Sequence, residues 1–457
     1  MELLPIIPTT DNNHNNPYIL SETEVNAHLK NLEWLSAKPI GELTVEENPN
    51  LLVFPQCLNE YKDGSSSQYI FTLRGNSIHT GNIMGFVGYK NTRIRIHSRF
   101  AKSDKQDFFL HYMLQKVFAV NLFDLKYTSD RDSIFDFLIY LFPAFLKRAL
   151  RQGLYREYQT KHYNDSHVRG RIDIGRHIRQ NIPFTGRIAY STREYSADNA
   201  VTQLIRHTID FIAHHPYCGN ILQNDEETKR GISSIYEATN NTYNRQDRQR
   251  VINANLRPLN HPYFSEYKQL QQLCLRILRH EELKYGTSNR DKIYGILFDG
   301  AWLWEEYLAT VIESTKLMKH CVRGKNTQYL FTNPLSQPIV PDFLNIEKKL
   351  VGDAKYIPLD SKHISSESES ALAIYYKTVM YMYRFNCPTG YLFYPYSNGS
   401  DQKIDELTIN NEQKDRLFKI GMPIPQDYIG WDDFKERMNQ YEKYLLKEIY
   451  NKAHRVL

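Results

Sequence analysis

Short β-rich segments dominate the first 130 residues of the chain. Gln68–Leu73 (QYIFTL), Phe86–Tyr89 (FVGY) and Arg93–His97 (RIRIH) are rich in β-branched and aromatic residues. The last of them alternates apolar and polar residues with the period of two that is typical of a strand. Glycines separate these segments and mark turns or bulges. The pattern predicts a β-rich N-terminal domain over residues 1–130.

Apolar residues recur at helical spacing over much of residues 131–285, which predicts a mainly helical middle region. Asp198 is the expected N-cap of a long helix through Ile212. The other expected elements are a helical stretch from about Asp132 to Lys161, strands at Val168–Ile174 and Gly186–Tyr190, and a helix at Tyr267–His280.

Residues 286–457 have an informative order of elements, helix-strand-strand-strand-helix-strand, followed by a helical tail. The expected elements are a helix at Ala301–Lys319, strands at Gln328–Thr332, Pro338–Ile346 and Leu350–Pro358, a helix at Ala371–Phe385 and a strand at Gly390–Tyr396. Glu347-Lys348-Lys349 would form the tight turn of a hairpin. Such an order predicts a mixed sheet flanked by helices, and the fold class is α+β multidomain.

The composition is that of a globular protein. Of 457 residues, 41% are hydrophobic and 24% charged, and the five cysteines form no CxxC pair. A disulfide framework or structural zinc site is therefore not expected. The most apolar stretch, Ile134–Leu146, contains Asp136 and Pro143 and is shorter than the roughly 20 apolar residues that span a bilayer. Together with an N-terminus unlike a signal peptide, this predicts a cytoplasmic protein with no membrane association.

The charge is mildly positive, at +5, but the basic residues are unevenly spread. Between Lys147 and Arg193 there are eleven Lys or Arg and three Asp or Glu. This run, which includes Arg169 and Arg171, is either a solvated face or a surface that contacts DNA or a partner. The same alternatives hold for Arg93 and Arg95 on the expected N-terminal strand.

The expected hairpin carries the residues with the clearest chemistry. Asp353 and Lys355 are two positions apart and share one face of a strand, and Asp342 on the preceding strand can converge with them. Two carboxylates suit Mg²⁺, which takes few protein ligands and several waters or phosphate oxygens. A nearby lysine can orient a water and stabilise charge on phosphate. The alternative interpretation is a structural ion pair.

The helix before this hairpin offers a third acid. Trp304, Tyr307 and Leu308 belong to one apolar stripe at helical spacing. Glu305 lies at the edge of that stripe and Glu306 nearly opposite it. Glu305 is therefore the residue expected to reach the site. The histidines show no metal-ligand spacing, and a surface or capping role is expected for them.

Pro341-Asp342 with Asp353-Ala354-Lys355 resembles the PD-(D/E)xK nuclease signature. More closely, the chain resembles the McrC family, the nuclease subunit of McrBC-type 5-methylcytosine-specific restriction systems. The stretches that carry the resemblance are Arg93–Arg99 (RIRIHSR), Val168–Asp173 (VRGRID), Arg193–Tyr195 with Asp198-Asn199, Phe298–Leu308 (FDGAWLWEEYL) and Asp353–Tyr356 (DAKY).

The resemblance implies a Mg²⁺-dependent endonuclease that cuts double-stranded DNA at modified-cytosine sites selected by a partner. The implied partner is an AAA+ GTPase ring of the McrB type, into which the N-terminal region docks. Asp342, Asp353 and Glu305 would hold the metal. The family often has a glutamine followed four residues later by a tyrosine on the next helix, and here these positions are Lys377 and Tyr381.

Two other functions stay open on the sequence. A non-catalytic assembly factor would dock on and stimulate the AAA+ motor without cutting, and the lysine at position 377 favours that possibility. A stand-alone repair nuclease would cut without a GTPase. No Walker motif is present, because Gly324-Lys325 is followed by Asn326, so the chain is not expected to hydrolyse nucleotide by itself.

Overall fold

The structure is a computed structural model of the whole chain. It describes residues 6–14, 16–43, 51–55, 68–102, 107–118, 130–215, 219–223, 225–284, 293–322, 326–357, 369–397 and 403–453. Within these ranges, none of the helices has the length and apolar character needed to cross a membrane.

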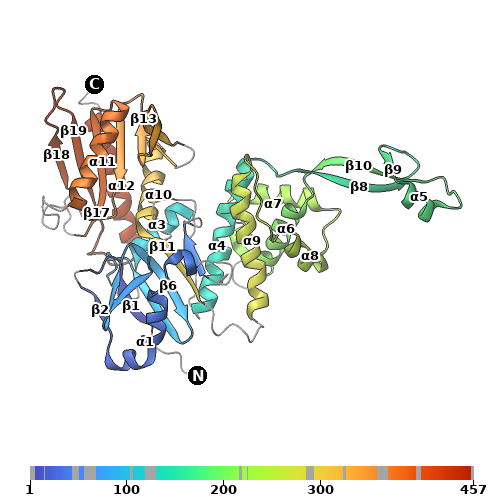
Figure 1. The fold of residues 1–457 in the computed structure, drawn as a ribbon, viewed down its shortest axis with the longest axis horizontal. Helices are drawn as coiled ribbons and strands as arrows, with labels where there is room; N and C mark the ends of the chain where they lie inside the picture. Colours follow the sequence, from blue (N-terminus) through green and yellow to red (C-terminus); the bar gives the residue numbers. More distant parts are fainter. Residues whose placement is uncertain are drawn as a thin grey trace. The chain divides into compact units, whose positions relative to one another are not determined.

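The chain divides into two compact units (Figure 1). One combines Met1–Ala119 with Arg290–Leu457, and the other is Val120–Asn289. The sequence predicted three consecutive domains with boundaries near residues 130 and 285. The structure instead groups the β-rich N-terminal segment with the C-terminal segment in a single unit.

The N-terminal part of the first unit is built on a five-stranded sheet in the order β1-β7-β6-β11-β3. Its strands are β1 (Ile7–Thr10), β3 (Leu51–Phe54), β6 (Ile83–Tyr89), β7 (Thr92–His97) and β11 (Tyr294–Asp299). A smaller sheet contains β2 (Tyr18–Ile19), β4 (Phe71–Arg74) and β5 (Ser77–Thr80), and two helices accompany it, α1 (Glu22–Ser36) and α2 (Ile40–Leu43). The predicted β-rich N-terminal region is confirmed.

A strand from the C-terminal segment completes this N-terminal sheet. β11 pairs antiparallel with β6 and parallel with β3. Gly85 lies at the closest approach, because a Cβ there would come within 2.1 Å of the Ile296 carbonyl oxygen, and its φ is +125°. Only glycine fits this position without moving the paired strand.

The C-terminal part of the first unit is a six-stranded mixed sheet in the order β12-β15-β16-β17-β19-β18. Its strands are β12 (Lys319–His320), β15 (Phe343–Asn345), β16 (Leu350–Ala354), β17 (Thr389–Tyr396), β18 (Ile404–Thr408) and β19 (Arg416–Pro423). The central pairs β16–β17 and β17–β19 are parallel. A separate hairpin joins β13 (Gln328–Thr332) and β14 (Leu335–Ile339).

Helices bury both faces of this mixed sheet. All eight residues of β17 are buried, as expected of a strand covered on both sides. Leu392 and Tyr394 pack with Tyr381 and Met382 of α11 (Glu369–Phe385) on one face. The intervening Tyr391 donates a hydrogen bond to the Ile449 carbonyl of α12 (Trp431–Ala453). The remaining helices here are α3 (Phe108–Phe118) and α10 (Gly300–Ile312).

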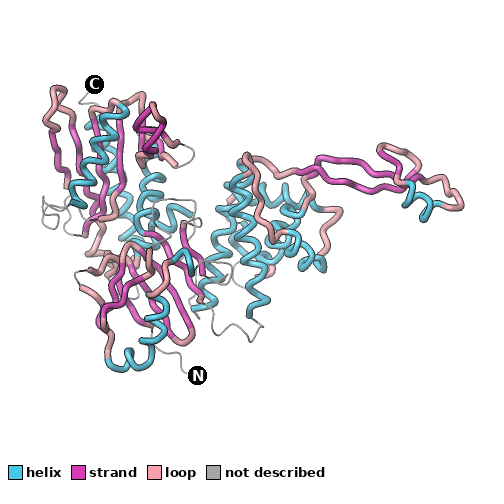
Figure 2. The backbone as a smooth tube through the Cα atoms, in the orientation of Figure 1, coloured by secondary structure: helices cyan, strands magenta, loops and turns pink. Residues whose placement is uncertain are grey.

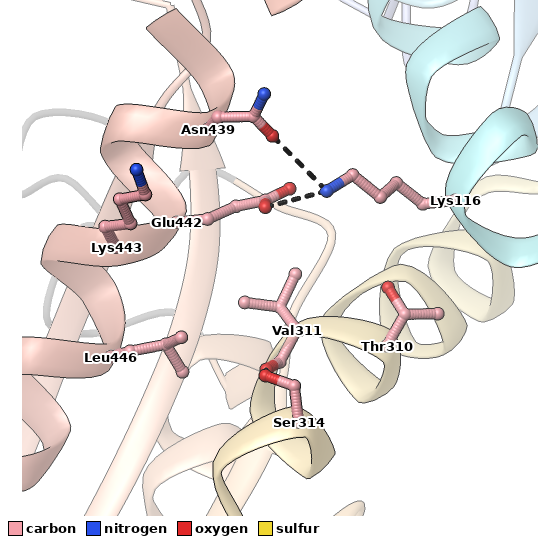
Figure 3. Close-up of a pocket in the computed structure, with 8 residues that line it drawn as sticks. All are labelled: Lys116, Thr310, Val311, Ser314, Asn439, Glu442, Lys443 and Leu446. Carbon is pink, nitrogen blue, oxygen red and sulfur yellow. Dashed lines mark hydrogen bonds and ion pairs between the residues drawn. The ribbon is translucent and has the colours of Figure 1, made fainter. Parts of the chain in front are cut away.

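The second unit is a group of helices with a long β-hairpin (Figure 2). The helices are α4 (Asp130–Arg151), α6 (Ala200–Ala213), α7 (Glu226–Thr239), α8 (Arg248–Ala254) and α9 (Ser265–Lys284). The hairpin consists of β8 (Glu157–Asp165) and β10 (Ile188–Ser196), and its far end carries β9 (Arg171–Ile172) and α5 (Ile174–Asn181).

Several boundaries in the second unit differ from the sequence prediction. The helical stretch expected to reach Lys161 ends at Arg151, and residues from Glu157 form a strand instead. The N-cap of α6 is Asn199 rather than Asp198, since the Asn199 side chain accepts the Thr202 backbone N–H.

In the first unit, β15 and β16 form the predicted hairpin. The strand predicted at Pro338–Ile346 is divided between β14 and β15.

Replacing Gly85 by alanine should destabilise the first unit by about 3 kcal/mol, because the new methyl group collides with the paired strand in a strained backbone conformation. Thermal and urea denaturation measure the loss. Gly81→Ala is the matched control, since a Cβ there meets nothing within 4 Å. Equal destabilisation by both substitutions would contradict the close-approach explanation.

Candidate active site

The β15–β16 hairpin brings Asp342 and Asp353 to facing positions. Phe343 pairs with Gly352 in the antiparallel register, and one step further along this register Asp342 lies opposite Asp353. The Ala354 backbone N–H donates to Asp342 Oδ2 at 2.6 Å. This hydrogen bond fixes the Asp342 carboxylate at the end of the strand that carries Asp353.

Asp353 is fully buried and is compensated by two lysines. Lys355, two residues on, forms a close ion pair with Asp353 Oδ2. Lys377 of α11 places its Nζ 3.6 Å from Asp353 Oδ1. A buried carboxylate without such partners is costly. The structure therefore joins the predicted pair on β16 with the predicted accessory residue on α11.

Glu305 reaches the same site from α10. Asp299 ends β11 and caps α10 by accepting the backbone N–H groups of Ala301 and Trp302, which sets the start of the helix. Glu305 Oε1 lies 2.8 Å from His320 Nε2. Glu306, expected to be solvated, is half-buried.

Three acids interact electrostatically in this site. Burial raises the pKa of Asp342 well above its usual range, and the charges of Asp353 and Glu305 raise it further. Lys355 and Lys377 oppose that rise without cancelling it. Burial and the two neighbouring acids therefore disfavour the ionised form of Asp342 more than the two lysines favour it.

His320 belongs to the site although its sequence context gave no sign of it. Its side chain is largely buried beside Glu305, and the neighbouring Cys321 N–H donates to the Asp342 carbonyl at 2.9 Å. Burial lowers the pKa of His320, but the hydrogen bond and charge of Glu305 outweigh burial, and the pKa is raised. A lone histidine before a loop carries no pattern that predicts such a contact.

Tyr381 is buried below Lys377 on the inner side of α11. Its hydroxyl donates to the Val340 carbonyl at 3.0 Å, which ties the helix to the segment leading into Asp342. Burial raises the pKa of Tyr381 to about 12. The pKa of Lys377 is also raised, because the charges of Asp353 and Asp342 outweigh its burial. Tyr381 is therefore a neutral side chain that connects α11 to the segment before Asp342.

Arg99 of the N-terminal segment holds the end of the strand that carries Lys355. Its Nη2 donates to the Tyr356 carbonyl at 2.9 Å, and its guanidinium lies 4.3 Å from the centre of the Tyr356 ring. The buried Asp11 anchors Arg99 through an ion pair of 3.5 Å and through the Arg99 backbone N–H. The N-terminal sheet is in this way connected to the candidate active site.

The other predicted contact residues lie elsewhere. Arg93 and Arg95 are half-buried on β7, which pairs with strands on both sides and is not an edge. Arg169 and Arg171 belong to the hairpin of the second unit. Both are exposed, and Arg169 also donates to the Tyr190 hydroxyl at 3.1 Å.

The acidic residues suit a hard divalent cation in their chemistry. Among the described residues, no three His, Cys, Asp or Glu side chains are grouped closely enough to hold a metal ion. The facing carboxylates of Asp342 and Asp353 are nevertheless oxygen donors of the kind that Mg²⁺ takes while keeping several waters. A cation beside Asp342 would also favour its ionised form, which burial and the neighbouring acids disfavour.

Comparison with protein families assigns the chain to a known family. The family model of the McrBC 5-methylcytosine restriction system component matches residues 78–395, which is more than half of the chain and contains the whole candidate site. The chain belongs to this family. The McrC-family resemblance that the sequence motifs indicated is confirmed.

Solved McrBC structures are similar to this family member at low identity. One is a refined half-complex from a tetradecameric assembly of Thermococcus gammatolerans McrB AAA+ hexamers with bound McrC, with 14% identity over 96% of this chain and 99% of that chain, and a TM-score of 0.46. Another is the Thermococcus gammatolerans McrBC complex, with 15% identity, coverage of 68% and 87%, and a TM-score of 0.31. No curated protein matches the chain.

Asp342→Asn should stabilise the metal-free protein, raising its melting temperature by about 2 °C in EDTA at pH 8. A carboxyl whose pKa is higher in the folded than in the unfolded state costs stability as pH rises above the unfolded pKa of about 4. The gain should therefore vanish near pH 4 and grow with pH. Asp427→Asn, at an exposed aspartate, is the control. A destabilised Asp342→Asn protein at pH 8 would contradict the argument that burial and neighbouring acids disfavour the ionised Asp342.

Proposed function

We propose that this chain is the DNA endonuclease subunit of a modification-dependent restriction system, and that it hydrolyses phosphodiester bonds of double-stranded DNA with Mg²⁺. The observation that carries the proposal is the hairpin that sets Asp342 opposite Asp353 with Lys355 paired to Asp353. Membership of the McrBC family supports it. A fully buried aspartate paired with a mostly buried lysine at the end of a strand is a costly arrangement for a purely structural role.

The proposed core is of the PD-(D/E)xK type. In support, helix α10 precedes strands β15 and β16, and α11 and the parallel strand β17 follow them. The acids and the lysine then stand at one end of the central strands, with Glu305 entering from α10.

Each side chain has a distinct proposed role. Asp342 and Asp353 would hold Mg²⁺, and Glu305 would complete the acidic set. When bound, the cation supplies Lewis-acid polarisation of the phosphodiester and a more acidic attacking water. Lys355, fixed by Asp353, would orient that water and stabilise the negative charge that builds on phosphate. His320 would hold Glu305 in place.

The proposed partner is a McrB-like AAA+ GTPase ring that selects modified-cytosine sites and drives cleavage. The sequence resemblance assigns docking to the N-terminal region, 1–130. The described structure offers a further contact surface at the far end of the β8–β10 hairpin, where several large apolar side chains are exposed. They are Ile172, Ile174, Ile178, Ile182 and Phe184. An exposed apolar group of this kind is typical of a protein-binding surface.

Replacement of the catalytic pair tests the proposed reaction. Asp353→Ala and Lys355→Ala should each lower the rate of plasmid cleavage by at least about 10²-fold, the range expected for loss of a group that stabilises transition-state charge. Modified plasmid, Mg²⁺, the partner GTPase and GTP are required together. The controls are unchanged circular dichroism and unchanged stimulation of the partner's GTPase. Cleavage by a cleanly purified double variant at the wild-type rate would refute the proposal.

The same assay distinguishes the assembly-factor alternative. That function predicts full GTPase stimulation by the wild-type chain with no metal-dependent cutting of any modified plasmid. Cutting by the wild-type chain without a GTPase would instead favour a stand-alone repair nuclease.

Charge introduced at the hairpin end should separate partner binding from catalysis. Ile178→Asp combined with Phe184→Asp should reduce GTPase stimulation about tenfold or more, because burying a new carboxylate in an interface is unfavourable. Ile429→Asp, at an exposed isoleucine of the first unit, is the matched control. Wild-type stimulation by the double variant would restrict docking to the N-terminal region.

A further inference from the structure

Helix α11 has two chemically different faces. Ile374, Tyr381, Met382 and Phe385 pack into the core of the mixed sheet. On the other side, Tyr376 and Tyr383 are 67% and 88% exposed. Tyrosine side chains this exposed are unusual on a helix whose other aromatic residues are buried, and the core does not require them.

The exposed tyrosines lie on one face, and Lys377 lies about 100° round the helix from Tyr376, at the edge of that face. Tyr376 and Tyr383 are seven residues apart, which at about 100° per residue places them within roughly 20° of each other and about 10.5 Å apart along the axis. Lys377 follows Tyr376 directly. Arg384 follows Tyr383 in the same way, and its Nε donates to the Tyr329 carbonyl of the β13–β14 hairpin at 2.9 Å. The helix thus carries two tyrosine–cation pairs, Tyr376-Lys377 and Tyr383-Arg384.

The helix carries more cations than acids. After its first residue, Glu369, α11 contains two cations and no Asp or Glu, and the neighbouring hairpin, Gln328–Ile339, has no charged residue at all. Within the described part of the chain, neither the Tyr376 ring nor the Tyr383 ring stacks on another aromatic ring. Cations, hydroxyl donors and open aromatic faces are the groups that contact a nucleic-acid backbone and its bases.

The face is continuous with the candidate active site through Lys377. Its side chain is 46% exposed, yet its Nζ lies 3.6 Å from the buried Asp353 Oδ1. One ammonium therefore borders both the acidic site and the solvent. Lys355, by contrast, is mostly buried and is held by Asp353 alone among the described acids.

We propose that the outer face of α11, made of Tyr376, Lys377 and Tyr383, binds the substrate DNA, with Lys377 contacting a phosphate at the cleavage site and the two tyrosines contacting the same strand beside it. The inference rests on the proposed nuclease function and adds the surface along which the DNA lies. The occupant is DNA rather than a second copy of the chain, because the cations that follow the two tyrosines complement phosphate, and Lys377 borders the candidate active site.

Binding can be measured apart from cleavage. The full-length chain is titrated onto a fluorescently labelled, modified 30-base-pair duplex in EDTA, alone and with the partner GTPase, over a series of salt concentrations. Tyr376→Ala with Tyr383→Ala should weaken binding about tenfold. Lys377→Gln should reduce the slope of log affinity against log salt by about 1, the change expected for one lost phosphate contact. Tyr450→Ala, at a 53% exposed tyrosine on α12, is the matched control and should bind as the wild type does.

The outcomes separate this inference from the proposed function. Wild-type DNA affinity in the double tyrosine variant, or an unchanged salt slope in Lys377→Gln, overturns the inference even if the wild-type chain cuts DNA. A change of sedimentation in the double variant with unchanged DNA affinity overturns it too, and shows an interface between copies. Loss of affinity in these variants, with a wild-type chain that binds but never cuts, supports the DNA-binding face and refutes the nuclease function.

Discussion

A carboxylate withdrawn completely from water must be compensated nearby, and in this protein the compensation of Asp353 organises the C-terminal half of the first unit. Its two ammonium partners come from different places, Lys355 from directly after the same strand and Lys377 from the helix that crosses over to the parallel strand β17. These ion pairs join the strand to the helix beside the Asp342 carboxylate.

The N-terminal sheet takes part in this arrangement rather than forming a separate module. β11 completes that sheet and ends at Asp299, which begins the helix carrying Glu305. Arg99, which follows β7 of the same sheet, donates a hydrogen bond to the carbonyl of Tyr356, the residue after Lys355. The candidate site is therefore connected to the N-terminal sheet twice, through the start of α10 and through Arg99. A partner bound to that sheet would be linked to the acids and the lysine by these two connections.

The lysine at position 377 changes the electrostatics of the site relative to the family pattern. A glutamine there would offer hydrogen bonds but leave Asp353 with one cation. The lysine adds a second cation, and the acids in turn keep it charged, since they raise its pKa. At Asp342, by contrast, burial and two neighbouring acids disfavour the ionised form and raise the pKa. A divalent cation bound there would favour the ionised form.

The sequence alone determined the local features of this protein. The β15–β16 hairpin, the side-chain face shared by Asp353 and Lys355, and the position of Glu305 at the edge of an apolar stripe all follow from periodicity over a few residues. The family followed from the same motifs. The contacts of His320, Arg99 and Lys377 were decided by the tertiary structure, because each joins residues that are distant in sequence and leave no periodic signal. Likewise, β11 joins a sheet formed some 200 residues earlier. Strand pairing at such separation depends on which buried surfaces fit together, which only the folded chain specifies.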